Sequence, residues 1–304
     1  MQQGQGSPQA LLLGCGYSGL ALGARLAAQG VQVVGTVRDA THKGEPLRAA
    51  HITPVSWTLG QPVEPCLRAL GPVPVDIIYM IPPARGPAGA DPLEPMRAAL
   101  DALCDKLDVR ALLYVGATSV YGDAHGGVVS AQTPRLPRSP HGKARAASED
   151  LCWELGAQRG LRAMLARLPG IYGPERSVLE RLRDGSYLLV DGGHKWTARI
   201  HRDDIAMGLE VLLAHGQGGQ AYVLCDDTPF QVREMVAWAC ERLRLPWPRE
   251  VSLEDYTRQH GEFAASFWRT SNRYDNHHIR SLPGFSLAYP SFREGYEALL
   301  QGER

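Results

Sequence analysis

The stretch Ala10-Leu11-Leu12-Leu13-Gly14-Cys15-Gly16-Tyr17-Ser18-Gly19 decides how this chain of 304 residues folds. Its first four residues are a short apolar run that ends at glycines, which predicts a buried strand. The residues from Gly19 to Gln29 follow a helical pattern and end at Gly30, a typical helix C-cap. Val31 to Val37 is predicted as the next strand. A strand, a helix and a strand within about 30 residues form a βαβ unit, whose right-handed crossover builds parallel sheet.

The alternation of strands and helices continues along the chain. Further strands are predicted at Val75–Ile81, Ala111–Val115, Arg162–Leu168, Ala198–His201 and Gln220–Cys225, and further helices at Pro92–Leu107, His141–Arg159, Asp204–His215, Glu234–Leu243 and Phe292–Gln301. Asp203 and Asp204 stand where they would cap one of these helices. The order predicts an α/β fold, a doubly wound parallel sheet with a smaller C-terminal lobe. We expect residues 8–175 and 196–226 to form the sheet domain, and residues 176–195 and 227–304 to form the substrate-binding lobe.

The composition excludes several classes of protein. Lys plus Arg number 32 and Asp plus Glu number 32, so the formal net charge is zero and offers no surplus for nucleic acid or an anionic membrane. No apolar run approaches the roughly 20 residues of a membrane span. The six cysteines, at positions 15, 66, 104, 152, 225 and 240, form no CxxC pair, which favours buried thiols over disulfides or a zinc site. We expect a cytoplasmic protein without a metal site.

The glycine-rich turn predicts a dinucleotide site. Gly14 permits a tight turn, Gly16 lets a pyrophosphate approach the backbone, and Gly19 lets the helix pack closely on the strand. The N-terminus of the helix that follows offers unpaired amides to the phosphates, and we expect Tyr17 and Ser18, within the motif, to bind the cofactor as well. The alternative is a turn that is merely rich in glycine.

The end of the second strand bears on which cofactor is bound. A carboxylate there binds the ribose 2′-hydroxyl of NAD, but the sequence is Gly35-Thr36-Val37-Arg38-Asp39. Arg38 offers a guanidinium that can pair with a 2′-phosphate, so NADP is favoured over NAD, with Thr36 beside it. In the alternative interpretation, Arg38 is a solvated surface residue and Asp39 faces the ribose.

Several segments together resemble a known family. Tyr114-Val115-Gly116-Ala117-Thr118-Ser119-Val120-Tyr121-Gly122 is similar to the SSxxVYG segment of extended short-chain dehydrogenases/reductases, the NAD-dependent epimerase/dehydratase-like proteins. The glycine motif at 14–19, the segment Arg167 to Pro174 and the segment Arg199 to Ala206 agree with that family in order and spacing. The strand ending in Pro82-Pro83 and the segment Tyr289 to Leu299 are nearest to its YeeZ-like branch.

The resemblance implies a seven-stranded parallel Rossmann sheet that binds NAD(P), with Pro82 and Pro169 following strands that border the cofactor. Members oxidise, epimerise or dehydrate small hydroxylated substrates, often nucleotide sugars. A homodimer through the family's fourth and fifth helices is also implied. The family's catalytic set is a Ser or Thr in the SSxxVYG segment and a downstream YxxxK, in which the tyrosine relays a proton.

This chain departs from that set at three positions. Ala117 stands at the expected hydroxyl position, His141 replaces the tyrosine, and Arg145 replaces the lysine. His141 and Arg145 are four residues apart and therefore share a helix face. We interpret His141 as acting on the substrate proton, Arg145 as anchoring ribose or substrate, and Ser119 or Thr118 as orienting the substrate oxygen.

Two alternatives stay open at this point. His141 is equally consistent with a residue that caps its helix or faces solvent. The missing tyrosine and lysine are also consistent with a protein of another class, a non-catalytic module that senses NADP(H) and signals through a partner.

Overall fold

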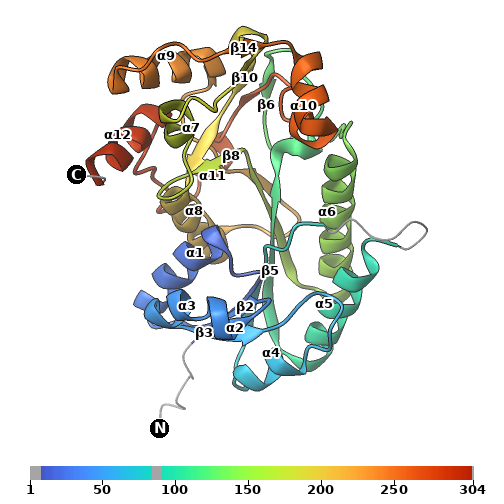
Figure 1. Ribbon diagram of the computed structural model, residues 1–304. Helices are drawn as coiled ribbons and strands as arrows, with labels where there is room; N and C mark the ends of the chain where they lie inside the picture. Colours follow the sequence, from blue (N-terminus) through green and yellow to red (C-terminus); the bar gives the residue numbers. More distant parts are fainter. Residues whose placement is uncertain (1–7, 84–90, 303–304) are drawn as a thin grey trace.

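A seven-stranded parallel sheet organises the fold. The structure, a computed structural model, describes residues 8–83 and 91–302 (Figure 1). The strand order is β12-β7-β5-β4-β1-β2-β3, and all six neighbouring pairs are parallel. The strands are β1 (Gln9–Leu13), β2 (Gln32–Val37), β3 (Ile52–Ser56), β4 (Val75–Tyr79), β5 (Val109–Ala117), β7 (Arg162–Leu168) and β12 (Ala221–Val223). This confirms the predicted doubly wound sheet, whose order reverses between β1 and β4, where ligands of such sheets bind.

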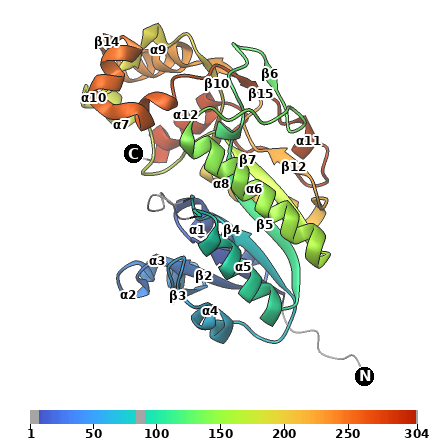
Figure 2. The ribbon, with the colours of Figure 1, turned by 90° about the vertical axis from the view of Figure 1, so that its right-hand side faces the viewer.

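Helices bury both faces of the sheet. Alternate residues of a strand point to opposite faces, so Leu12 of β1 packs in a core with α1 (Tyr17–Ala28) and α8 (Arg202–His215). Leu11 and Leu13 point the other way, into a core with three other helices. These are α4 (Glu64–Ala69), α5 (Glu94–Lys106) and α6 (Pro140–Arg159), and α5 and α6 lie side by side over that face (Figure 2). Burial of both faces explains why the strands are continuous apolar runs rather than alternating ones.

A smaller group of helices, with its own core, lies beyond the carboxyl ends of the strands (Figure 1). It contains α7 (Leu179–Arg183), α9 (Val232–Leu243) and α12 (Phe292–Gly302). The Tyr172 and Tyr296 rings meet there with centroids 4.7 Å apart. Gly295 allows this contact, because a Cβ at that position would lie 1.8 Å from the Tyr172 hydroxyl oxygen. The exact division of the chain into two domains stays a prediction.

Short elements complete the described chain. The helices are α2 (Ala40–Lys43), α3 (Glu45–Ala49), α10 (Leu253–Ser266), α11 (His277–Arg280) and the 3₁₀ turns η1 (Thr118–Val120) and η2 (Asp191–Gly193). The strands are β6 (Val128–Val129), β8 (Gly170–Tyr172), β9 (Leu189–Val190), β10 (Trp196–Thr197), β11 (Arg199–His201), β13 (Phe230–Gln231), β14 (Glu250–Val251) and β15 (Arg273–Tyr274). Within residues 8–83 and 91–302, no helix combines the length and apolar character that crossing a membrane requires.

Two features differ from the sequence-based expectations. The edge strand β3 was not predicted, because Pro54 interrupts its pattern; an edge position tolerates proline. The residue that caps α8 is His201, whose Nδ1 accepts from the Asp203 amide at 3.2 Å, so the prediction of an aspartate cap was wrong. Asp204 instead accepts hydrogen bonds from the amides of Ala288 and Tyr289 at 2.8 and 3.1 Å.

A buried ion pair joins α6 to the sheet. Arg167 of β7 is 2% exposed and Glu149 of α6 is fully buried. The guanidinium donates to both carboxylate oxygens, at 2.9 and 2.8 Å. A further nitrogen of Arg167 donates to the Tyr121 hydroxyl at 2.7 Å and to the Ala131 carbonyl at 3.1 Å. One buried arginine therefore fixes the positions of α6, β7 and the segment that follows β5.

We predict that Glu149→Gln destabilises the protein by about 3–5 kcal/mol, because it leaves the Arg167 charge buried without a negative partner. Urea unfolding measures the change. Arg97→Met is the control. It removes the exposed ion pair between Arg97 of α5 and Glu154 of α6, the helix that also carries Glu149, and should change stability far less. The double variant Glu149→Leu with Arg167→Met should recover most of the stability that Glu149→Gln loses. Equal stability of the wild type and Glu149→Gln would contradict this role.

Candidate functional site

The glycine-rich turn lies between β1 and α1, with the backbone conformation that its sequence predicts. Gly14 has φ of +86°, in the left-handed region, and a Cβ there would lie 2.8 Å from Ile81. A Cβ on Gly19 would lie 3.3 Å from the Met80 sulfur. Gly16 differs, because a Cβ there would meet only the Gly14 carbonyl oxygen, at 4.0 Å. Glycine is therefore required at Gly14, Gly19 packs closely against the Met80 side chain, and the space before Gly16 is open.

The first turn of α1 is equipped to bind an anion. No side chain caps the helix, and no described residue accepts a hydrogen bond from the amides of Tyr17, Ser18 or Gly19. Free amides at a helix N-terminus bind phosphate groups, and the helix dipole adds to the attraction. The turn therefore fits the pyrophosphate of a dinucleotide.

Tyr17 closes one side of this turn with its side chain. Its hydroxyl donates to the Pro174 carbonyl at 2.8 Å. Two guanidiniums, those of Arg176 and Arg202, lie 5.6 and 5.1 Å from its ring centroid. The predicted cofactor-binding residue Tyr17 thus ties α1 to the segment after β8 and gathers positive charge beside the free amides.

Thr36, Arg38 and Asp39, at the end of β2, have three different environments. Thr36 is buried, and its hydroxyl accepts from the Gly14 amide at 2.8 Å, which holds the turn in place. Asp39 caps α2 by accepting from the Thr41 and His42 amides, and it also pairs with the His42 ring. Arg38 is exposed and forms no hydrogen bond or ion pair with a described residue. Among the described residues at this strand end, the charge without a partner is therefore positive.

The start of α6 approaches η1 very closely. A Cβ on Gly142 would lie 2.4 Å from the Ser119 carbonyl oxygen, so only glycine permits the contact. Ser139 caps the helix by accepting from the Gly142 amide at 3.2 Å. The Ser119 hydroxyl is buried and has no hydrogen-bond partner among the described residues. This unpartnered hydroxyl belongs to the residue whose backbone carbonyl lies against the start of α6.

Thr118 is placed differently from Ser119. It is buried, and its hydroxyl forms a hydrogen bond with the Tyr274 phenol, which partly opposes the rise in the pKa of Tyr274 caused by burial. Of the two hydroxyls predicted to orient a substrate, that of Thr118 is therefore engaged within the protein and that of Ser119 is not.

His141 lies in the first turn of α6 and faces the C-terminal lobe. Its Nε2 is 3.2 Å from the Ser139 hydroxyl. Its ring contacts those of Phe263 and Phe267, with centroids 5.3 and 5.7 Å away. Since Ser139 provides the cap and two phenyl rings cover the imidazole, His141 is neither the helix cap nor a fully solvated residue.

Arg145 lies one turn further along α6. Burial raises the pKa of the Tyr114 phenol at the end of β5 to about 12, and the charge of Arg145 opposes that rise. Arg145 is half-buried and forms no ion pair with a described residue. A half-buried cation without a carboxylate is suited to bind ligand hydroxyls or an anion. Lys143, between the two predicted residues, is exposed.

The remaining predicted residues lie at the same edge of the sheet. Pro82 follows β4 and Pro169 follows β7, so both stand at carboxyl ends of strands. Together with the glycine turn and Ser119, they border the place where the strand order reverses.

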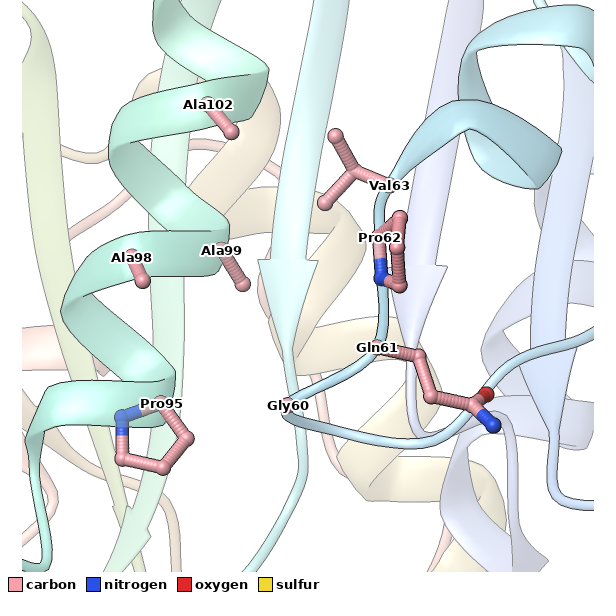
Figure 3. A pocket seen from close by; sticks show the side chains of 8 residues that line it. All are labelled: Gly60, Gln61, Pro62, Val63, Pro95, Ala98, Ala99 and Ala102. Atoms are coloured by element: carbon pink, nitrogen blue, oxygen red, sulfur yellow. The ribbon is translucent and has the colours of Figure 1, made fainter.

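A hollow of about 240 Å³ lies elsewhere, between the segment 60–63 and α5 (Figure 3). Its lining includes Gly60, Pro62, Pro95, Ala98 and Ala102, and no acid, base or charged side chain takes part. It therefore offers no catalytic chemistry. Among the residues that the structure describes, no three His, Cys, Asp or Glu side chains are grouped to hold a metal ion.

The parallel sheet, its reversal point and the glycine turn define a Rossmann-type nucleotide-binding protein. The chain belongs to the NAD dependent epimerase/dehydratase family, whose model matches residues 10–225. This confirms the resemblance to extended short-chain dehydrogenases/reductases.

Individual relatives agree with this assignment. Protein YeeZ of Escherichia coli is 30% identical over 223 residues, which cover 70% of this chain and 76% of YeeZ. A functionally unknown conserved protein from Silicibacter pomeroyi is 29% identical, with a TM-score of 0.82 over 97% of this chain and 98% of its own. The dTDP-glucose 4,6-dehydratase DesIV of Streptomyces venezuelae, with NAD and TYD bound, shares the fold at 20% identity, with a TM-score of 0.74 over 97% and 96% of the two chains.

Sequence reasoning missed some residues beside this edge of the sheet. Phe263 of α10 and Phe267, which directly follows that helix, are about half exposed, at 52% and 55%. Lys195 and Arg199 are two half-buried cations near them. The alternation of Lys195, Thr197 and Arg199 in the sequence is the signal that would have found these cations.

We predict that Gly142→Ala destabilises the protein by about 1–3 kcal/mol, because the added methyl group collides with the Ser119 backbone. Alanine forms helices more readily than glycine, so a net loss of stability is due to the collision with the Ser119 backbone. Urea unfolding measures it, with Lys143→Ala on the same helix as the control. A variant as stable as the wild type would show that α6 and η1 tolerate separation.

Proposed function

We propose that this protein is an NAD(P)-dependent enzyme that oxidises, epimerises or dehydrates a nucleotide sugar. The observation that carries the proposal is the placement of Ser119, His141 and Arg145 at the sheet edge that also holds the glycine turn. The dTDP-glucose 4,6-dehydratase that shares the fold adds support for a nucleotide sugar. When bound, the nicotinamide would supply hydride transfer.

Ser119, His141 and Arg145 would each have a separate role in binding the substrate or moving its proton. The unpartnered Ser119 hydroxyl would donate a hydrogen bond to the substrate oxygen. His141 would accept the proton of a substrate hydroxyl as a general base. Arg145 would also bind ribose or substrate hydroxyls.

NADP is the proposed cofactor within this NAD-dependent family. Arg38 has no partner in the described chain, whereas Asp39 is engaged as the cap of α2. A 2′-phosphate would find a guanidinium at this strand end, but a 2′-hydroxyl would find no free carboxylate.

We further propose how the protein assembles and where it is located. The family resemblance favours a homodimer. All six cysteines are free, which is consistent with a reducing compartment such as the cytoplasm.

We predict that Arg38→Ala raises the Kd for NADP⁺ about tenfold to a hundredfold and leaves the Kd for NAD⁺ nearly unchanged, because only NADP⁺ carries the 2′-phosphate. Fluorescence titration measures both. Lys43→Ala, which removes an exposed cation from the neighbouring helix α2, is the control. A similar rise in the Kd for both nucleotides would show that Arg38 does not select between them.

We predict that His141→Ala lowers turnover by about 10²–10⁴-fold without changing the Kd for the nucleotide, because it removes the proton acceptor alone. Chromatography of the products formed from dTDP-glucose or UDP-glucose with NADP⁺ present measures turnover by epimerisation or dehydration, in which the hydride returns to the sugar, and nicotinamide absorbance measures net oxidation. Lys143→Ala is the matched control on the exposed side of α6. If the wild type binds NADP⁺ tightly but transfers no hydride to or from either sugar nucleotide, the non-catalytic sensor is favoured instead.

A further inference from the structure

Ser139 and His141 form a hydrogen-bonded pair at the start of α6. The Ser139 Oγ lies 3.2 Å from His141 Nε2. The same oxygen accepts from the Gly142 amide at 3.2 Å, which is the contact that caps the helix. A serine hydroxyl has one hydrogen to donate and two lone pairs with which to accept. The cap uses one lone pair and leaves the hydrogen and the second lone pair for other partners.

His141 Nε2 is the acceptor best placed for the hydroxyl hydrogen of Ser139. The Gly142 amide can only donate, so within the part of the chain that the structure describes Nε2 is the acceptor at hydrogen-bond distance from this hydroxyl. A neutral imidazole accepts at one ring nitrogen and carries its hydrogen on the other. With Nε2 accepting from Ser139, the ring hydrogen belongs on Nδ1. The pair therefore has the arrangement of a hydroxyl backed by a base.

Two phenyl rings cover part of the His141 imidazole. Phe263 approaches it with its ring plane at 69°, and Phe267 with its ring plane at 31°. The two phenyl rings also contact each other, with centroids 5.3 Å apart. Gly261, just before them, has φ of +80° and ψ of +165°, a conformation almost confined to glycine, which bends α10 at this point. Since the phenyl rings lie against the imidazole and Ser139 holds its accepting nitrogen, a substrate hydroxyl reaches that nitrogen through the serine.

The Ser139 oxygen lies beside the segment that carries Ser119. A Cβ on Gly142 would lie 2.4 Å from the Ser119 carbonyl oxygen and 3.0 Å from the Ser139 Oγ, so these two oxygens flank the same point. The Ser119 hydroxyl is buried and has no hydrogen-bond partner among the described residues. Ser119 belongs to η1, directly after β5, and Ser139 directly precedes α6. The two serines are therefore neighbours beyond the carboxyl end of β5.

We propose that Ser139 is the catalytic hydroxyl of this protein and that His141 acts through it. This inference rests on the proposed function. In the oxidation of a substrate alcohol, the substrate hydroxyl donates to the remaining lone pair of Ser139. Its proton passes to the Ser139 Oγ while the Ser139 proton passes to His141 Nε2, and the hydride leaves the carbon that bears the hydroxyl for the oxidised nicotinamide. The carbon becomes a carbonyl and the imidazole becomes charged, and reduction reverses each transfer.

Variants at two helix caps test this proposal. Asparagine caps helices as well as serine does but has no hydroxyl, so Ser139→Asn keeps the cap and removes the relay. We expect it to lower turnover of dTDP-glucose or UDP-glucose about 10²–10³-fold and to leave the Kd for NADP⁺ unchanged. Ser139→Thr keeps a hydroxyl and should retain turnover within about tenfold of the wild type. Ser252→Asn, which changes the serine cap of α10, is the matched control and should not change turnover.

Nuclear magnetic resonance of the full chain without cofactor gives a second readout that does not depend on how the Ser139 variants fold. The ring signals of His141 are those lost in His141→Ala, and the nitrogen shifts of the neutral ring should place the hydrogen on Nδ1. A hydrogen on Nε2, turnover retained in Ser139→Asn, or an equal loss in Ser139→Thr would overturn the relay and leave the proposed function intact. Absence of turnover in the wild type would overturn the proposed function together with the relay.

Discussion

The buried ion pair between Arg167 and Glu149 is the contact on which the geometry of the site depends. It joins the middle of α6 to β7, and through Tyr121 and the Ala131 carbonyl it also holds the segment after β5. Every candidate catalytic group lies on one of these segments. Because a buried charge tolerates no loss of its partner, the three segments are constrained to keep one arrangement. The close contact between Gly142 and Ser119 then sets the height of α6 over the sheet edge.

The backbone position of residue 141 is determined independently of the side chain that it carries. The close packing at Gly142 and the Ser139 cap place position 141 at the sheet edge whatever side chain it carries. The chain has an imidazole there, and at position 145 it has a guanidinium that lies beside Tyr114. An imidazole titrates in a lower pH range than a phenol, but the position of the titratable group is the same.

Sequence predicts best those features that depend on neighbouring residues. The turn at Gly14–Gly19 and the strands around it follow from local apolar runs and glycine positions, and the family resemblance supplied the number of strands. The cap of α8 by His201 could not be predicted, because aspartate is the commoner cap and His201 is held by the rings of Tyr172 and Tyr289. The contact between Phe267 and His141 could not be predicted from the sequence either. It depends on how the end of α10 packs against the start of α6, which is distant along the chain.

The contact between Gly295 and Tyr172 has a consequence for the order of folding during synthesis. Tyr172 follows β7 and is made long before α12, yet the core that buries it is closed by Phe292 and Tyr296 of that helix. The nascent sheet must therefore leave the ribosome with this aromatic surface still uncovered. Until α12 arrives, the growing chain presents the kind of apolar surface that chaperones bind.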